Sequence, residues 1–155
     1  MADIEKTGDW DGFAAILAKA SSQFKSNIKK ATDTSGRLLE GKIVQRIQSG
    51  QVAPPTGAEF RAWKEKHGYS GTTLIMTSDL LNAVKYENKS WAEGFVGVNR
   101  NRVGKDGTSL GSIAAYHEYG GGRTKARPFI SPVVQSEGSK IAENYQKAID
   151  ETFNK

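Results

Sequence analysis

The stretch IAAYHEYGGGRTKARPFISP, residues 113–132, decides the fold. Its first part, 113–119, is apolar enough to form either a strand or a short helix. The three glycines and the spaced cations that follow predict a long surface loop over residues 120–126. Pro128 then fixes its own backbone torsion, and Phe129 is expected to re-enter the core as an anchor. The stretch therefore predicts a loop held at both ends, and it marks no catalytic constellation.

Helices are expected on both sides of this stretch. Downstream, Ser131 is a good N-cap and Pro132 suits the first helical position. Upstream, the apolar spacing of residues 9–50 predicts a helix, with Asp9 as its N-cap and Gly50 at its end. The apolar face of the downstream helix comprises Val134, Ile141, Tyr145, Ala148 and Phe153. That of the upstream helix comprises Phe13, Leu17, Ala20, Phe24, Ile28, Ala31, Leu38, Leu39, Ile43 and Ile47.

The upstream helix has a weak centre and an unusual length. Residues 32–36 (TDTSG) are poor helix formers, so the pattern fits either one long helix or two helices joined by a hinge. We favour one helix. At 1.5 Å per residue it would be about 60 Å long, which exceeds the width of a domain of this size. Its surplus apolar stripe must then either fold back at the hinge or pack against a neighbouring subunit.

Two shorter units are expected between the long helix and the central stretch. Residues 51–78 look like an insertion that contains a short helix. Thr56 and Glu59 have the spacing of a capping box for this helix, and Trp63 is expected to anchor it in the core. Ser78 is expected to cap a further short helix.

A β-hairpin is expected next. Residues 84–87 and 91–98 have strand patterns, and residues 88–90 between them have the composition of a turn. Residues 99–110 then form a basic, glycine-containing loop. The sequence therefore predicts an α+β fold in which a long N-terminal helix and a C-terminal helix pack on a small antiparallel β-sheet.

Composition limits the classes of function. The 155 residues fit one domain, residues 9–155, preceded by a flexible N-terminus, residues 1–8. The chain has no cysteine, which excludes disulfides and thiolate metal sites. No signal peptide is visible, and no apolar run approaches the roughly 20 residues of a membrane span. We therefore expect no membrane contact and a protein that is made and kept in solution on the cytoplasmic side. The formal net charge of +5 permits contact with an acidic surface.

The His117-Glu118 pair does not form a metal motif. A helical zinc site of the protease type needs a second histidine four residues further on, and position 121 is glycine. The other histidine, His67, is distant in the sequence, so no metal ion, cofactor or catalytic group is predicted. We expect His117 instead to make a side-chain hydrogen bond in a semi-buried loop. A hydrolase would require an ordered pocket with a perturbed titratable group, and no serine lies in a G-x-S-x-G elbow.

The basic residues favour nucleic acid as an alternative partner. If they line one surface, they could hold phosphates with a salt-dependent affinity, although no known nucleic-acid-binding motif is recognisable. A basic nucleic-acid-binding protein of a mobile element is therefore the alternative function. The cations concerned are Lys19, Lys25, Lys29, Lys30, Arg37, Lys42, Arg46, Arg100, Arg102, Lys105, Arg123, Lys125 and Arg127.

A resemblance to a known family rests on several short segments. They are Leu74 with 77–80 (TSDL), 95–98 (FVGV), 115–120 (AYHEYG) and 126–132 (ARPFISP). Their order resembles the tail-component or virion-morphogenesis family of tailed bacteriophages, which includes tail-completion, head–tail joining and minor tail proteins of the Mu and lambda types. The likeness is specific only over residues 115–132. Ser78 departs from the pattern, because the family usually has glycine there.

The resemblance implies a structural virion protein with an α+β fold and no enzyme activity. It implies a role in tail completion or head–tail joining, as a ring, for example a hexamer, at the tail end or the neck of the particle. The expected partners are further copies of the chain, tail-tube proteins and neck or connector proteins. DNA that passes through the ring would be contacted only passively.

The candidate interface is the central stretch itself. Phe129 is expected to pin one end of its loop, and Tyr116 and Tyr119 the other, so that the loop is held as an arm. The cations of the arm would face an acidic partner surface. In the alternative, Arg127 only pairs with Glu118 inside the domain. The candidate interface or loop-anchoring residues are Tyr116, His117, Glu118, Tyr119, Gly120, Arg123, Lys125, Arg127, Pro128 and Phe129.

Overall fold

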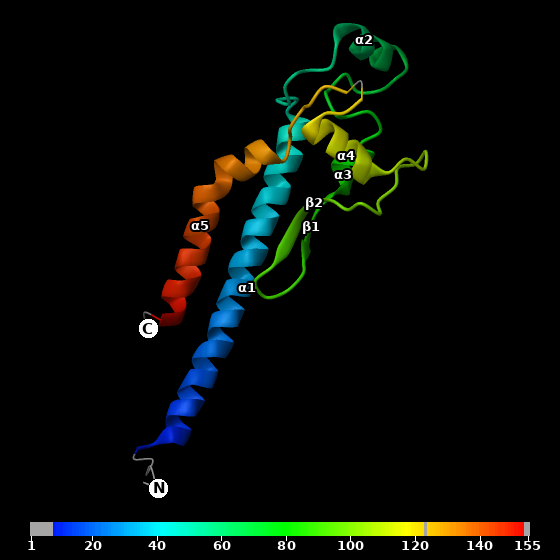
Figure 1. Cartoon of the computed structure of the whole chain (residues 1–155). Helices are drawn as coiled ribbons and strands as arrows, with labels where there is room; N and C mark the ends of the chain where they lie inside the picture. Colours follow the sequence, from blue (N-terminus) through cyan, green and yellow to red (C-terminus); the bar gives the residue numbers. More distant parts are fainter. Residues whose placement is uncertain (1–7, 123, 154–155) are drawn as a thin grey trace.

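The computed structural model describes residues 8–122 and 124–153, and over these ranges the chain forms five helices and two strands. In chain order they are α1 (Trp10–Gln48), α2 (Ala58–Lys66), α3 (Asp79–Ala83), β1 (Val84–Asn88), β2 (Gly94–Val98), α4 (Leu110–Tyr119) and α5 (Ser131–Phe153). Figure 1 shows α1 as the axis of the molecule, with α5 along one side and the β-hairpin along another. The predicted α+β fold is confirmed. The predicted flexible N-terminus, apart from Gly8, lies outside the described residues.

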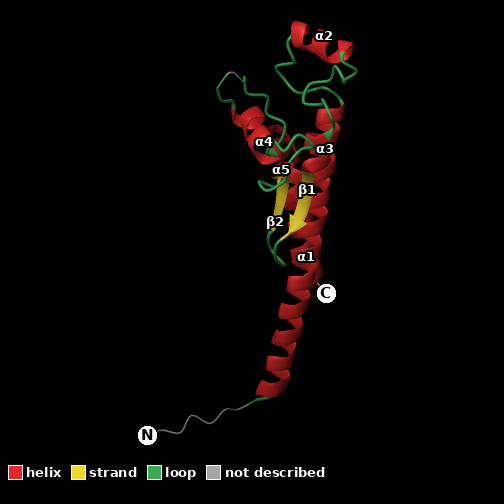
Figure 2. Ribbon diagram, turned by 90° about the vertical axis from the view of Figure 1, so that its right-hand side faces the viewer, coloured by secondary structure: helices red, strands yellow, loops and turns green. Residues whose placement is uncertain are grey.

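α1 is one continuous helix of 39 residues, so the single-helix prediction is confirmed. The Asp9 carboxylate accepts a hydrogen bond from the backbone N–H of Gly12 at 2.8 Å, which is the predicted N-cap. The helix ends at Gln48, and Gly50 follows with a φ of 70°. Figures 1 and 2 both show that the N-terminal part of α1 extends beyond α5 and beyond the hairpin.

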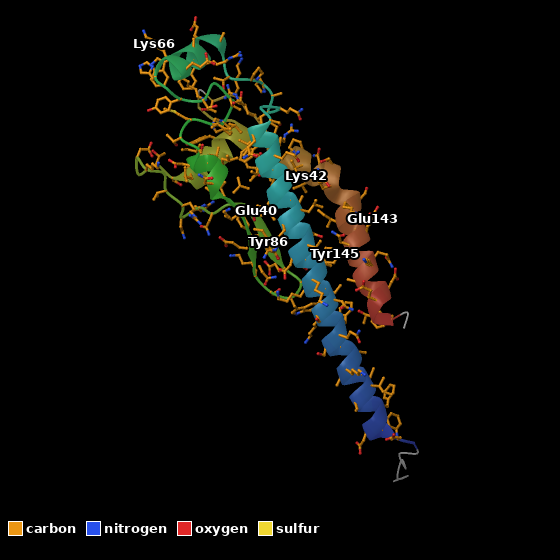
Figure 3. All side chains as sticks on the ribbon, turned by 180° about the vertical axis from the view of Figure 1, so that it is seen from behind. Glu40, Lys42, Lys66, Tyr86, Glu143 and Tyr145 are labelled. Carbon is orange, nitrogen blue, oxygen red and sulfur yellow. The ribbon has the colours of Figure 1, made fainter. Side chains whose placement is uncertain are left out.

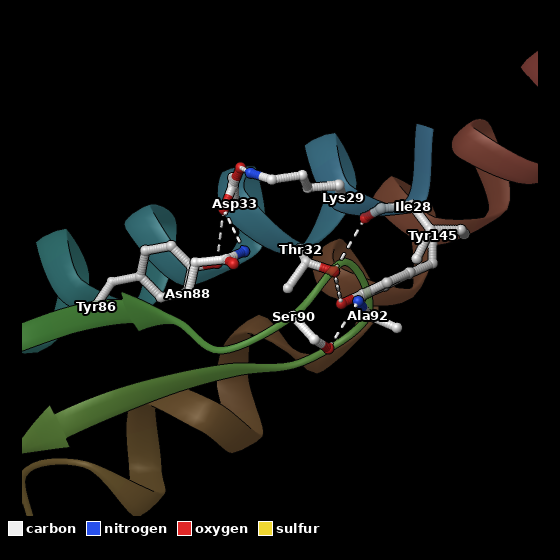
Figure 4. Close-up of polar contacts among 9 residues, drawn as sticks. All are labelled: Ile28, Lys29, Thr32, Asp33, Tyr86, Asn88, Ser90, Ala92 and Tyr145. Atoms are coloured by element: carbon white, nitrogen blue, oxygen red, sulfur yellow. Dashed lines mark hydrogen bonds and ion pairs between the residues drawn. The ribbon is translucent and has the colours of Figure 1, made fainter. Parts of the chain in front are cut away.

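The weak centre of α1 is where its neighbours pack. The Thr32 hydroxyl donates to the Ile28 carbonyl at 2.9 Å and shares a second hydrogen bond of 2.9 Å with the Tyr145 hydroxyl of α5 (Figure 4). Three residues further on, Ser35 accepts a hydrogen bond from the Asn144 side chain at 3.1 Å. The small polar residues that lower helix propensity here are the ones that let α5 approach, so tertiary packing keeps the segment helical.

The β-hairpin packs on another side of α1. β1 and β2 are antiparallel, with Val84 opposite Val98. At the free edge of β1, Glu40 of α1 accepts the backbone N–H of Tyr86 at 2.7 Å, and the Tyr86 hydroxyl donates to Asp33 at 2.8 Å (Figures 3 and 4). The expected hairpin is confirmed. Its second strand is shorter than expected, because β2 begins at Gly94.

The main core lies around the C-terminal half of α1. It combines α1 with residues from the loop after it, from α3 and β1, and from both sides of the central stretch. Its buried members are Ile43, Ile47, Val52, Leu80, Val84, Ala114, Phe129 and Val133. A smaller cluster of Ile28, Ala31 and Ala148 joins α1 to α5.

Two predictions for the insertion at 51–78 are wrong. The capping box does not form, because Gly57 is the N-cap of α2 and makes no side-chain cap bond. Trp63 is 42% exposed and stacks on its neighbours within α2 instead of entering the core. The buried side chain of this helix is Lys64, 3% exposed, whose Nζ donates to the carbonyls of Thr72 and Ile75. A lysine therefore ties α2 to the following loop.

The close contact between Tyr86 and α1 yields a testable pair of substitutions. A Cβ at position 36 would lie 2.2 Å from two carbons of the Tyr86 ring, whereas a Cβ at Gly41 would meet nothing within 4 Å. Gly36→Ala should therefore cost about 1–3 kcal/mol of stability through overpacking. Gly41→Ala should instead gain up to about 1 kcal/mol through helix propensity. Urea unfolding of both variants measures the contrast, and equal effects would exclude close packing at Gly36.

The prediction that the Ser78 side chain caps α3 is also wrong. Ser78 makes no side-chain cap bond and instead adopts a left-handed backbone with a φ of 64°. That conformation costs an L-residue about 1–2 kcal/mol and costs glycine little. Ser78→Gly should therefore raise the unfolding free energy by about 1 kcal/mol. Ser78→Ala keeps the Cβ and serves as the control, which should show no such gain in the same urea titration.

Candidate functional site

The central stretch begins as a helix, which decides between the two predicted alternatives. Ser109 caps α4, since its hydroxyl accepts the backbone N–H of Ser112 at 3.3 Å. α4 ends at Tyr119, and Gly120 then takes a φ of 78°, which favours glycine. His117 and Glu118 therefore lie in the last turn of a helix and not in a loop.

The glycine-rich loop is closed by a tight turn. The backbone N–H of Gly121 donates to the Thr124 carbonyl at 3.1 Å, and the N–H of Thr124 donates back at 2.9 Å. The ring of Tyr116 covers Gly121, because a Cβ there would lie 2.7 Å from the ring. Where an extended arm was predicted, the backbone of Gly121 therefore pairs with that of Thr124 in a tight turn. Lys125 is exposed, and Arg123 lies outside the described residues.

Glu118 forms the central interaction of the site. Its carboxylate is 7% exposed and accepts four hydrogen bonds from the segment that leads into α5. Oε2 accepts the backbone N–H groups of Phe129 and Ile130 at 2.9 and 3.0 Å. Oε1 accepts the N–H of Ser131 at 2.8 Å and the Ser131 hydroxyl. We call this arrangement the Glu118 cap, because it satisfies donors at the N-terminus of α5.

The Glu118 cap corrects two expectations. Ser131 is the first residue of α5, and its hydroxyl donates to Glu118 instead of capping the helix itself. Arg127 makes no ion pair with Glu118, so the alternative of an internal salt bridge is wrong. The Arg127 Nε donates to the carbonyl of Pro54 at 2.9 Å, and its backbone N–H donates to the carbonyl of His117.

Hydrogen bonds decide the ionisation of Glu118. Burial alone would raise the pKa of its carboxyl, but the bonds from the Ser131 hydroxyl and from three backbone N–H groups outweigh burial and hold the pKa below its usual value. The carboxylate is therefore ionised at neutral pH and is stabilised by donors, without a counter-ion among the described residues.

The predicted anchors divide into one that is buried and two that are not. Phe129 is fully buried in the main core, so the expected anchor at this end of the loop is confirmed. Tyr116 is 55% exposed and Tyr119 is 79% exposed, so neither ring is a core anchor. The Glu118 cap takes over the role that was assigned to the tyrosines, since it holds the other end of the loop.

A pocket of about 470 Å³ lies beside the Glu118 cap, between the α2 segment, α3 and α4. Sequence analysis missed it, because its walls come from segments that are far apart in the chain. Both non-glycine residues with a left-handed backbone in the described ranges, Leu74 and Ser78, line this pocket. Its apolar lining includes Phe60, Leu74, Met76, Leu80, Leu110 and Ile113, and its charged or titratable lining comprises Lys64, Tyr69, Asp79, Lys105, Asp106, His117 and Arg127.

The histidine of the pocket, His117, has no described hydroxyl as a hydrogen-bond partner. The expected side-chain hydrogen bond of His117 is not made by its Nδ1, which is buried and has no hydrogen-bond partner among the described residues. Burial lowers the pKa of the His117 imidazole, and the positive charge of Arg127 lowers it further. Burial also lowers the pKa of Lys64, and the negative charge of Glu65 raises it by a smaller amount. An activated nucleophile needs a hydrogen bond to its base, and no described hydroxyl bonds to His117.

Comparisons with models of known families, with characterised proteins and with solved structures found no match. Within residues 8–122 and 124–153, no three His, Asp or Glu side chains come close enough to share a metal ion. No helix in these ranges has both the length and the apolar character that crossing a bilayer requires. The function is therefore argued from the residues and their geometry.

The Glu118 cap predicts a specific acid response. Because the pKa of Glu118 is lowered on folding, its contribution to stability is complete above the unfolded pKa of about 4.3 and is lost as pH falls through the lower folded value. Glu118→Gln should destabilise the protein by about 3 kcal/mol at pH 7, since charged hydrogen bonds are lost. The difference from wild type should shrink below about pH 4.

Glu143→Gln is the matched control, because Glu143 is exposed and its ion pair among the described residues is with Lys140. It should change stability by less than about 1 kcal/mol at any pH. Urea unfolding across pH measures both variants. A Glu118→Gln difference that stays constant down to pH 2 would show that the carboxylate charge is not what matters.

Proposed function

We propose that the protein is a structural component of a tailed-bacteriophage virion that acts in tail completion or head–tail joining. It assembles as a ring at the tail end or the neck, contacts tail-tube and neck or connector proteins, and catalyses no reaction. Virion assembly takes place in the host cytoplasm. DNA that passes through the ring makes passive contacts.

The observation that carries the proposal is the Glu118 cap. The two segments that carry the family resemblance, 115–120 and 126–132, are brought together by it. Glu118 comes from the first segment, and the backbone groups that it binds come from the second. Phe129, buried in the core, comes from the second as well. A resemblance whose residues depend on one another physically supports common ancestry more than a string of unrelated matches does.

Ser78 provides a second, independent support. It is the one position in the matched segments where this chain departs from the family's glycine. Its φ of 64° is a conformation that glycine adopts at little cost, so the family's preference has a physical reason in this fold. A glycine would occupy this turn at a lower cost, which supports the resemblance despite the departure.

A genetic test addresses the role in the particle. Deletion of the coding sequence from the phage genome that carries it should leave assembled heads and tails that do not complete or do not join. Infectivity should fall by orders of magnitude and return with the wild-type protein supplied in trans. Electron micrographs of the lysates identify the missing step. Normal, infectious particles from the deletion would overturn the proposal.

A gel shift with the purified protein and duplex DNA distinguishes this function from the alternative. A nucleic-acid-binding protein of a mobile element should retain duplex DNA in a gel shift at physiological ionic strength, and the affinity should fall steeply with salt. A structural virion protein that meets DNA only passively should not. Retention together with normal particles in the deletion would favour the alternative.

A further inference from the structure

The N-terminal part of α1 continues past its partner helix. α5 ends beside Phe24 and Asn27: the ring of Phe153 lies 5.9 Å from that of Phe24, and the Asn27 side chain donates to Thr152 at 3.0 Å. Residues 10–23, which we call the overhang, continue for about 20 Å beyond this point. In Figures 1 and 2 the overhang stands clear of every other element.

The overhang exposes large apolar side chains next to acidic ones. Trp10, Phe13, Ile16 and Leu17 are 54%, 52%, 67% and 54% exposed. Trp10 and Phe13 form an edge-to-face pair with ring centroids 6.3 Å apart, which we call the aromatic knob. Asp9 and Asp11 flank Trp10. A cluster of exposed aromatic side chains of this kind marks an interaction surface.

The pocket beside the Glu118 cap has the complementary chemistry. Most of its lining is apolar, and Met76 at its edge is 41% exposed. Lys105 and Arg127 form no ion pair with any described carboxylate, and only the Nε of the Arg127 guanidinium has an acceptor. The two carboxylates of the lining, Asp79 and Asp106, already accept hydrogen bonds from nearby loop residues. The lining therefore holds three cations, Lys64, Lys105 and Arg127, against two carboxylates, and neither Lys105 nor Arg127 forms an ion pair with a described carboxylate.

We propose that the aromatic knob of one copy inserts into the pocket of a second copy, with Asp11 facing Lys105 and Arg127. The inference rests on the proposed function, because it names the contact that closes the ring. Aromatic side chains that fill a pocket dominate interface energies, and about 470 Å³ lies within the range of cavities that hold a group of this size. The opposite charges at the rim orient the knob.

Trp10 begins α1, whereas α2, α3 and α4, which contribute residues to the pocket, lie at the other end of this helix (Figure 1). The 39 residues of α1 span about 60 Å. A chain with a continuous α1 therefore cannot fill its own pocket, and the second copy is the occupant. Because the two surfaces differ, the contact is heterologous. Repetition of a heterologous contact gives a closed ring when the rotation between copies closes, and an open filament when it does not.

Two full-length variants test the contact. Trp10→Ala with Phe13→Ala removes the knob, and Met76→Glu with Lys105→Glu reverses the charge of the pocket edge through exposed residues. Each should weaken self-association at least about tenfold, as expected for hot-spot residues, while the unfolding temperature stays near that of wild type. Sedimentation velocity over a concentration series, from micromolar to hundreds of micromolar, measures the association.

Matched controls remove an exposed aromatic ring or add equal charge elsewhere. Phe95→Ala removes an aromatic ring on β2 that is 39% exposed. Val134→Glu with Lys140→Glu, both on α5, makes the same change of net charge as the pocket variant, and both side chains are exposed. Both controls should associate like wild type.

Mixing the two defective variants gives the decisive result. In a head-to-tail contact, each variant keeps one intact surface, so the mixture should form a heterodimer that neither variant forms alone and that grows no further. Recovery of no complex, although wild type assembles, would indicate that two knobs pair with each other and would overturn the proposal. A wild-type chain that stays monomeric over the whole series would overturn it as well. Either failure leaves the deletion phenotype of the particle untouched, so the proposed function is judged separately.

Discussion

The fold depends on one buried carboxylate. Glu118 at the end of α4 satisfies three backbone N–H groups and a hydroxyl at the start of α5, so all four lone-pair positions of its oxygens are used. No cation among the described residues shares it, and the positive end of the α5 dipole supplies the favourable potential. This cap fixes the corner between α4 and α5 and thereby places Phe129 against Ile43 and Ile47 of α1.

From that corner α5 runs back along α1, and the hairpin occupies another side of the same turns. The residues at 32–36 serve both neighbours: Thr32 and Ser35 bond to α5, and Gly36 leaves room for Tyr86 of the hairpin. Larger residues at these positions would have raised helix propensity but would have kept one neighbour away. Side chains from both neighbours converge on this short segment, so its sequence reflects packing more than local preference.

Local signals were sufficient for several elements, although the capping signals at Thr56, Ser78 and Ser131 did not form the expected caps. The Asp9 cap, the end of α1, the hairpin and the burial of Phe129 follow from spacing, turn chemistry and apolar pattern. The sequence was insufficient where a side chain serves a distant segment. The alternative that pairs Glu118 with Arg127 is wrong, because its partners are the Ser131 hydroxyl and backbone N–H groups, which have no letter in the sequence. Lys64 is buried because its Nζ donates to two backbone carbonyls of a later loop. The hydrophobic periodicity of the sequence gives no sign of this burial.

The overhang is easier to explain as part of an assembly than as part of a monomer. An isolated helix of its length is marginal in water, because nucleation is costly. The overhang avoids that cost, since it propagates from turns of α1 that α5 and the hairpin already hold. Its backbone is therefore ordered before any partner arrives, and Trp10 and Phe13 are presented in a fixed arrangement. Binding then pays little conformational entropy, which is the general advantage of a preorganised surface. The main core lies at the C-terminal end of α1, and the exposed apolar side chains lie at its N-terminal end. This arrangement fits a subunit whose N-terminal helix is buried only when it binds another subunit.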